Sequence, residues 1–281
     1  MRKQSVGSKF IRETCVAGAV IDETIKYSMT PGKGKRAAKT QPTREAVMRN
    51  NDRVAVKKLA RLMNANFFPG DWHLTLTYAG DAPSQAQAKK CISDFKNHMR
   101  RECRKIGKEF KFIEVTEYKN HRIHHHMLVN YIDKKIIEDQ WIHGSVNFKT
   151  LDRSRNYRKL AEYFVKETTK TMREPGNETK KRWNPSRNLT RPIVKREIVN
   201  PSVIYENPRE FKGYQIDEDT VRRFEHPFTH IEHLEYMMVS TDPVPRIKTW
   251  RKGKVVEKDE TYRRASEVQI CMDSLDGWDF I

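Results

Sequence analysis

The segment Glu117-Tyr-Lys-Asn-His-Arg-Ile-His-His-His-Met-Leu-Val-Asn130 carries most of the information about the fold of this chain. Its three consecutive histidines run into apolar residues, which predicts a β-strand from His124 to Val129. Successive side chains of a strand point to opposite faces of the sheet. We therefore expect His124 and His126 to share one face and His125 to point to the other.

A second strand is expected just before this segment. Residues 110–118, Phe-Lys-Phe-Ile-Glu-Val-Thr-Glu-Tyr, are rich in aromatic and β-branched side chains, and a short polar connection follows them. The two strands together predict an antiparallel β-hairpin. If residues 120 and 121 form its turn, Glu117 lies opposite His124, and two imidazoles and one carboxylate converge on one face. A register shifted by one residue would bring Thr116 onto that face instead.

Two imidazoles and one carboxylate are suitable ligands for a divalent cation that is held from one side only. Such a site leaves coordination positions open for the oxygen atoms of a substrate. Histidine clusters also occur in hairpins that bind nothing and simply face solvent. The local sequence leaves both interpretations open, and other parts of the chain have to distinguish them.

The composition indicates a compact core with a heavily charged exterior. Of 281 residues, 37% are hydrophobic and 33% are charged, and 55 lysines and arginines outnumber 37 acidic residues to give a net charge of +18. Such an excess of positive charge favours a polyanionic partner, most often nucleic acid. It is weaker support for membrane binding, because no basic amphipathic helix with bulky aromatic residues stands out.

Three further features bear on the cellular compartment. No apolar run is long enough to span a bilayer, and the first residues lack the apolar core of a secretion signal. The four cysteines are scattered and form no Cys-x-x-Cys pair, so we expect reduced thiols and no zinc site built from cysteine. We therefore expect a cytoplasmic protein without membrane partners.

The remaining patterns predict a central α+β domain. In chain order they indicate a strand, a helix, two hairpin strands, a helix, a strand and a helix, at residues 72–78, 85–106, 110–118, 124–129, 133–141, 145–151 and 156–168. This order suits a central antiparallel sheet flanked by helices. We assign residues 68–195 to this domain. Residues 1–67 form a basic N-terminal extension with a hairpin and a helix, and residues 196–281 form a C-terminal extension with a basic hairpin.

Basic residues follow the last helix of this domain. Lys181, Arg182 and Arg187 lie close to Trp183, a combination suited to phosphate contacts and base stacking. A charged loop anchored by one aromatic side chain is the alternative. Three histidines, at positions 226, 230 and 233, have no obvious acidic partner and are interrupted by a proline. We interpret these three as structural.

Four short motifs occur in a recognisable order: Leu74-Thr-Leu-Thr-Tyr78, Thr116-Glu-Tyr118, His124-x-His126 and Tyr163-x-x-Lys166. In this order they resemble the rolling-circle replication initiators of the HUH (His-hydrophobic-His) endonuclease superfamily. The similarity is greatest to the branch of plasmid, filamentous-phage and small isometric-phage replication proteins. It covers residues 68–195, where Asn184-Pro-Ser-Arg-Asn-Leu189 is similar to the segment that follows the catalytic helix. The resemblance implies an HUH endonuclease fold.

The resemblance also implies roles for individual residues. Glu117, His124 and His126 match the ligands of Mg²⁺ or Mn²⁺, and Tyr163 matches the nucleophile that forms a 5′-phosphotyrosyl link and leaves a 3′-OH primer. Lys166 matches the lysine beside it. A phenol has a pKa near ~10, so it needs help from a cation or a nearby ammonium to attack at neutral pH. One departure is His125, because that position of the family motif is usually a bulky apolar residue.

The order of the motifs bears on the subclass. Relaxases of this superfamily typically place the nucleophile before the histidines, whereas Tyr163 follows them, which favours an initiator. Tyr157 is a candidate second nucleophile, although six-residue spacing puts it on a different face of the helix. Two alternatives remain: a non-catalytic DNA-binding replication regulator, and an HUH transposase or relaxase of a mobile element.

The implied partners are single-stranded DNA at a replication origin and proteins that the chain itself does not supply. No Walker phosphate loop is present, so the resemblance implies a separate helicase, and a polymerase, from a bacterial host. The expected location is then the cytoplasm of that host.

Overall fold

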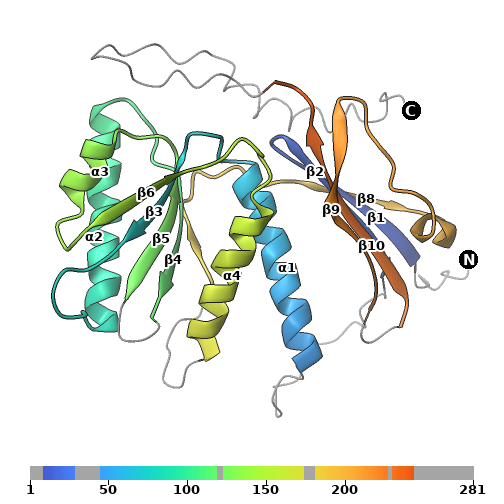
Figure 1. Cartoon of the computed structure of the whole chain (residues 1–281), viewed down its shortest axis with the longest axis horizontal. Helices are drawn as coiled ribbons and strands as arrows, with labels where there is room; N and C mark the ends of the chain where they lie inside the picture. The colour runs from blue at the N-terminus through green and yellow to red at the C-terminus, as the bar shows by residue number, and fades with distance from the viewer. Residues whose placement is uncertain (1–8, 29–44, 119–122, 174–180, 227–229, 244–281) are drawn as a thin grey trace, which may run out of the picture. The chain divides into compact units, whose positions relative to one another are not determined.

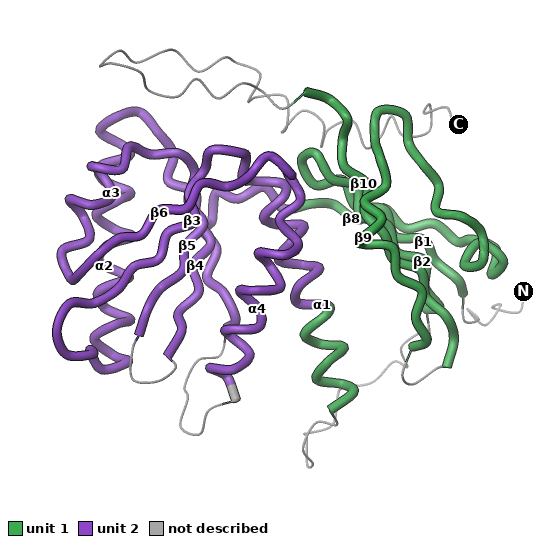
Figure 2. The backbone as a smooth tube through the Cα atoms, in the orientation of Figure 1, with its two compact units in different colours: residues 1–53, 192–243, 260–281 green, residues 54–191, 244–259 purple. Residues whose placement is uncertain are grey.

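The computed structural model describes residues 9–28, 45–118, 123–173, 181–226 and 230–243 (Figure 1). The chain divides into two compact units, shown in different colours in Figure 2. The central unit contains the described residues from 54 to 191. The terminal unit contains the described residues from 9 to 53 and from 192 to 243.

The central unit is built on a five-stranded sheet with the order β6-β3-β5-β4-β7. Its strands are β3 (Trp72–Leu76), β4 (Phe112–Glu117), β5 (His124–Val129), β6 (Val146–Thr150) and β7 (Asn184–Pro185). Every neighbouring pair is antiparallel. The predicted α+β class with a central antiparallel sheet flanked by helices is confirmed, and so is the predicted order of elements.

Helices cover both faces of this sheet (Figure 1). One face packs against α2 (Gln85–Lys105) and α3 (Lys134–Gln140), and the other packs against α4 (Arg158–Arg173) and the part of α1 (Glu45–Asn64) that belongs to this unit. The start of α2 is fixed by a capping box, in which Ser84 accepts from the backbone N–H of Gln87 and the Gln87 side chain accepts in return.

The two faces of the sheet have separate apolar cores because strand residues alternate. On β4, Phe112 packs in the core beneath α2, whereas Ile113 and Val115 pack in the core beneath α4. The same alternation on β5 sends Met127 toward α2 and Leu128 toward α4. Polar residues within these strands are therefore assigned to one face or the other by a tightly packed apolar frame.

The terminal unit contains a second five-stranded antiparallel sheet, with the order β8-β1-β2-β10-β9. Its elements are β1 (Lys9–Ala17), β2 (Val20–Ser28), β8 (Val194–Ile198), the 3₁₀ helix η2 (Pro201–Ile204), β9 (Tyr214–Glu225) and β10 (Glu232–Ser240). The predicted N-terminal hairpin corresponds to β1 and β2. The segments assigned above to an N-terminal and a C-terminal extension share this one sheet, through pairing of β2 with β10 and of β1 with β8.

Two further expectations concern the end of the chain. The basic hairpin expected in the C-terminal extension lies outside the described residues. Of the histidines interpreted as structural, His226 and His233 pack ring against ring at 5.1 Å, and His230 forms an ion pair with Glu225. Among the helices of the described residues, none has the length and apolar character needed to cross a membrane.

Candidate active site

The β4–β5 hairpin pairs in the register expected from the sequence. Glu117 lies opposite His124, and Val115 lies opposite His126. Thr116 lies opposite His125 on the other face, so the alternative register is wrong. The turn itself lies outside the described residues.

The pairing brings one carboxylate close to two imidazoles at the end of the hairpin. Oε2 of Glu117 is 3.7 Å from Nε2 of His124 and 3.6 Å from Nε2 of His126. The His126 side chain is only 7% exposed, whereas that of His124 is 29% exposed. The cluster is therefore anchored in the sheet at His126 and open to solvent at His124.

His126 has a defined partner at each ring nitrogen. Nδ1 lies 3.3 Å from Oγ1 of Thr75 on β3, and Nε2 lies 3.1 Å from the hydroxyl of Tyr163 on α4. When Nδ1–H donates to Thr75, the lone pair of Nε2 is left facing Tyr163 and Glu117. Burial, and the charge of His124, lower the pKa of His126 to about 4. The imidazole is therefore neutral at pH 7, which is the form that binds a cation.

Helix α4 presents Tyr163 to this cluster because its neighbours are held in the core. Ala161, Phe164 and Val165 are buried beneath the helix, whereas Tyr163 is 38% exposed. Partial burial raises the pKa of the Tyr163 hydroxyl, and the negative charge of Glu117 raises it further. The phenol is thus protonated at neutral pH in this structure, and positive charge placed near it would favour the phenolate.

Glu167 is a site residue that the sequence analysis missed. It lies one helical turn after Tyr163 and is 7% exposed. Burial raises the pKa of Glu167, but hydrogen bonds to Lys170 and Glu117 more than offset this effect, and the pKa lies below its ordinary value. Two carboxyl groups that share a hydrogen bond must also share a proton, so Glu117 and Glu167 concentrate negative potential here. The four-residue spacing from Tyr163 on an amphipathic helix was the available signal.

His73 on β3 is a second residue that was missed. Its ring lies 5.6 Å from that of His126 and 6.4 Å from that of Tyr163. Burial lowers the pKa of His73 to about 4, and its buried Nε2 has no hydrogen-bond partner in the described part of the chain. Its position on the His126 face follows from strand alternation, but its proximity to Tyr163 depends on where α4 packs.

His125, the unusual middle residue of the triplet, points into the core beneath α2. Its Nδ1 lies 2.8 Å from Oγ1 of Thr116, and its Nε2 lies 2.8 Å from the hydroxyl of Tyr78. Thr116 in turn donates to the buried carboxylate of Glu114. Both ring nitrogens are satisfied inside the protein, so a histidine replaces an apolar residue here without leaving a buried polar atom unpaired.

The other tyrosine and the lysine near Tyr163 differ in accessibility. Tyr157 lies just before α4 and is buried in the core at 3% exposure, which removes it from the surface that a second nucleophile would need. Lys166 is exposed on α4, and among the described residues it forms no hydrogen bond or ion pair. Its positive charge contributes to the lowered pKa of Glu167.

The three basic residues proposed for nucleic-acid contact are dispersed. Lys181 is exposed, Arg182 donates to Oγ1 of Thr169 on α4, and Arg187 lines a groove on the α2 side of the sheet. Trp183 is partly buried against the core beneath α4. A structural role for Trp183 therefore fits better than the predicted base stacking.

Cation binding at Glu117, His124 and His126 would require some rearrangement. Within the described residues, no group of three or more His, Cys, Asp or Glu side chains is already placed to hold a metal ion. The donor atoms are nevertheless 3.6 and 3.7 Å apart. Donors that are each about 2.1 Å from one ion lie about 3.0 Å apart at a right angle and farther apart at wider angles. Neutral imidazole and carboxylate fit Mg²⁺ or Mn²⁺ in chemistry and in spacing.

Comparison with known proteins adds a family. Residues 71–172 match the family described as Replication-associated protein ORF2. The matched segment, about a third of the chain, runs from just before β3 to the end of α4 and contains the whole cluster. Searches of curated proteins and of solved structures gave no match. The family match supports a role in DNA replication and interaction with DNA.

Proposed function

We propose that the central unit is an HUH-type endonuclease and strand transferase that nicks single-stranded DNA at an origin and starts rolling-circle replication. Three observations support this proposal. The family match is to replication-associated proteins, the net charge is +18, and the motif residues gather on one sheet face. The fold of the central unit, an antiparallel sheet flanked by helices, is compatible with that of an HUH enzyme.

A single observation carries the assignment. The hydroxyl of Tyr163 lies 3.1 Å from Nε2 of His126, and Oε2 of Glu117 lies 3.6 Å from the same nitrogen. A partly exposed phenol thus meets a set of cation ligands that comes from two neighbouring strands. Core packing does not require this, because the residues around Tyr163 on α4 already fill the core.

The proposed chemistry is a transesterification. The oxygen of Tyr163 forms a bond to a DNA phosphorus, and the bond from that phosphorus to the 3′ oxygen breaks and leaves a free 3′-OH. Mg²⁺ or Mn²⁺ held by Glu117, His124 and His126 would supply Lewis-acid polarisation of the phosphate. The phosphotyrosine conserves the energy of the cleaved bond, so the same site can rejoin two ends.

Two residues of α4 assist Tyr163 in this proposal. Lys166 is exposed one helical turn away, where an ammonium group can contact the phosphate and favour the phenolate. Glu167 acts as a positioning residue, because its hydrogen bond with Glu117 orients that carboxylate. The 3′-OH that is released would be extended by a host polymerase after a separate helicase has unwound the duplex in the bacterial cytoplasm.

The competing assignments predict different behaviour. A non-catalytic DNA-binding regulator would bind with steep salt dependence but never become covalently attached. A transposase or relaxase would form the same adduct, but on the ends of a mobile element. The position of Tyr163 after the histidines favours the initiator.

The proposal is tested with end-labelled single strands that tile the replicon encoding the chain. Incubation with Mn²⁺ should give an adduct that survives denaturing electrophoresis, is absent in EDTA and maps to the α4 peptide containing Tyr163. Tyr157→Phe is a matched control on the same segment and should retain the adduct if it folds normally. Tight binding of all strands without an adduct would support the regulator instead.

A further inference from the structure

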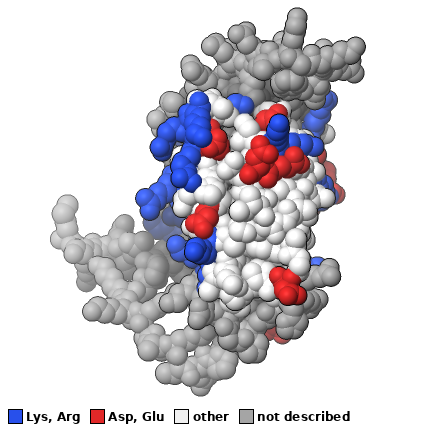
Figure 3. Space-filling model, turned by 90° about the vertical axis from the view of Figure 1, so that its left-hand side faces the viewer, with Lys and Arg blue, Asp and Glu red and all other residues white. Residues whose placement is uncertain are grey.

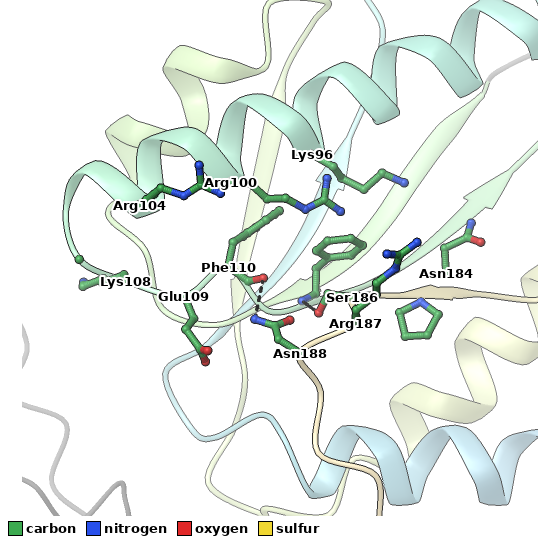
Figure 4. Close-up of a pocket in the computed structure, with 13 residues that line it drawn as sticks. Lys96, Arg100, Arg104, Lys108, Glu109, Phe110, Asn184, Ser186, Arg187 and Asn188 are labelled. Atoms are coloured by element: carbon green, nitrogen blue, oxygen red, sulfur yellow. Dashed lines mark hydrogen bonds between the residues drawn. The ribbon is translucent and has the colours of Figure 1, made fainter.

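A second basic site lies in the central unit, away from the Tyr163 cluster. It is a groove of about 870 Å³ between the C-terminal half of α2 and residues 184–188, at the edge of the sheet formed by β4 and β7 (Figure 4). Its floor includes Phe112, which faces α2. The groove is therefore on the sheet face opposite to His126 and Tyr163.

The lining of the groove is strongly cationic. Five basic side chains contribute: Lys96, Arg100, Arg104, Lys108 and Arg187. Figure 4 shows Arg100 and Arg187 projecting into the same space from its two sides. Among the described residues, neither Arg104 nor Arg187 forms an ion pair. Glu109 is the one acidic residue in the lining, and it already lies 3.7 Å from Lys111. Converging cations without acidic partners favour an anionic ligand.

A buried carboxylate arranges one end of the groove in advance. Glu114 is 1% exposed, and one of its oxygens accepts from Nζ of Lys96 at 3.0 Å and from Nδ2 of Asn184 at 3.1 Å. Burial raises the pKa of Glu114, but the charges of Lys96 and His125 more than offset this, so the carboxylate stays ionised. Its hydrogen bonds hold Lys96 and Asn184 in fixed positions before any ligand arrives.

The layout of the cations suits an extended ligand. Lys96, Arg100 and Arg104 are spaced four residues apart along α2, which places them about 6 Å apart along the helix axis. The opposite wall supplies the exposed amides of Asn184 and Asn188. A row of cations facing polar groups can follow successive phosphates of one strand. Small-molecule sites are mostly apolar and enclosed, unlike this lining.

The surface around α2 and α3 agrees with this picture. Figure 3 shows the side of the molecule where these helices lie, and Lys and Arg side chains gather along one margin of it. The central part of that face is largely uncharged. Positive charge is therefore concentrated in a band, as expected of a surface that follows a nucleic-acid backbone.

We propose that this groove binds the phosphate backbone of a single DNA strand on the sheet face opposite to Tyr163. The inference rests on the proposed function for the identity of the polyanion, because single-stranded DNA is then the substrate. It adds a second contact region that would hold the strand outside the cleavage site.

The test compares two double variants of the full chain. Arg104→Ala/Arg187→Ala removes two groove cations, whereas Arg101→Ala/Lys105→Ala removes two exposed α2 cations that do not line the groove. Fluorescence anisotropy with a single strand of about 30 nucleotides is measured over a range of salt concentrations. The groove variant should bind about 10-fold more weakly, and its slope of log affinity against log salt should fall by about 1.4. The control variant should keep the slope of the unmodified chain.

The outcomes separate this proposal from the nickase proposal. Equal losses in the two variants, or an unchanged slope in the groove variant, would overturn the groove assignment. A loss confined to double-stranded DNA would overturn its single-strand form. Anisotropy needs no covalent chemistry, so a Tyr163 that forms no adduct would leave the groove result intact. Conversely, an adduct on a short oligonucleotide that spans only the cleavage site should survive in the groove variant.

Discussion

Two tyrosine–histidine pairs stand back to back in the central unit, on consecutive residues of β5. Tyr78 pairs with His125 at 2.8 Å on the α2 face, and Tyr163 pairs with His126 at 3.1 Å on the α4 face. Both histidines are buried and both have a pKa lowered to about 4, chiefly by desolvation. The pairs are nearly alike in composition and geometry, yet only one of them is proposed to act on DNA.

The difference lies in what surrounds each pair. His125 is closed at both nitrogens, and its pair continues through Thr116 to the ionised Glu114 inside the sheet. Burial raises the pKa of Tyr78 far above its ordinary value, so its hydroxyl stays protonated. The Tyr163 pair opens instead toward solvent, Glu117 and a second histidine. A Tyr–His contact is therefore not a functional signature by itself, and adjacent carboxylates with an open side are what distinguish the site.

The largest effect is expected from removing one hydroxyl from each pair in turn. Tyr163→Phe should lower the yield of the covalent DNA adduct on the order of 10⁴-fold or more, because it removes the proposed nucleophile. Tyr78→Phe removes the equivalent group on the other face and should leave the adduct within a few-fold of that of the unmodified chain. Adduct formation on denaturing gels measures both.

The same experiment can break the comparison. If Tyr163→Phe forms an undiminished adduct, the nucleophile is another residue. If both variants lose the adduct while remaining folded by circular dichroism, the two pairs are coupled across the sheet and the contrast drawn above is wrong.

Cation binding should divide the two faces in the same way. Mn²⁺ at about 100 times its dissociation constant should stabilise the unmodified chain by about 2.7 kcal/mol, provided that it binds the folded state only. Glu117→Gln should abolish most of the resulting increase in Tm. Glu114→Gln changes a carboxylate on the same strand but on the opposite face, and it should lower Tm while retaining the increase with Mn²⁺. Equal Mn²⁺ responses of Glu117→Gln and the unmodified chain would exclude Glu117 as a ligand.

Much of the cluster could be predicted because its geometry is local. The positions of Glu117, His124 and His126 depend only on strand alternation and on a hairpin whose strands are close in sequence. His73 and Glu167 were missed because their approach to this cluster depends on how β3 pairs with β5 and how α4 packs on the sheet. Neither arrangement leaves a short-range pattern beyond ordinary amphipathic spacing.

The terminal unit shows the same limit at a larger scale. The hairpin of β1 and β2 was predictable from local alternation, but β2 pairs with β10, so Ile25 lies opposite Leu234. More than 200 residues separate these partners, and no turn or periodicity links them. Residues assigned to two extensions were consequently not recognised as parts of one sheet.

The pH dependence of stability should sharpen the contrast for His125. Its pKa is about 4 in the folded chain, chiefly through burial, and about 6.5 when unfolded. The unfolded state therefore binds the proton first, and stability present above pH 6.5 is lost as the pH falls toward 4. His125→Leu should reduce the slope of the unfolding free energy by up to one proton, about 1.4 kcal/mol per pH unit, between about pH 6.5 and 5.

This prediction is measured by urea unfolding in EDTA, so that His73 and His126 titrate equally in both proteins. Their pKa values are also lowered to about 4 and add the same slope to each curve. Curves of equal slope for His125→Leu and the unmodified chain would mean that His125 is already protonated in the folded state.

The smallest expected effect concerns the stability of the two phenylalanine variants. Tyr78→Phe leaves Nε2 of the fully buried His125 without its hydroxyl partner, which should cost about 1–2 kcal/mol of unfolding free energy. Tyr163→Phe removes a hydroxyl at a site that is 38% exposed, where water can replace it, and should change stability by less than about 0.5 kcal/mol. The order of stabilities would thus be the reverse of the order of activities. Equal destabilisation by the two variants would show that the Tyr163 hydroxyl also holds the fold together, and that its pairing with His126 is as structural as that of Tyr78 with His125.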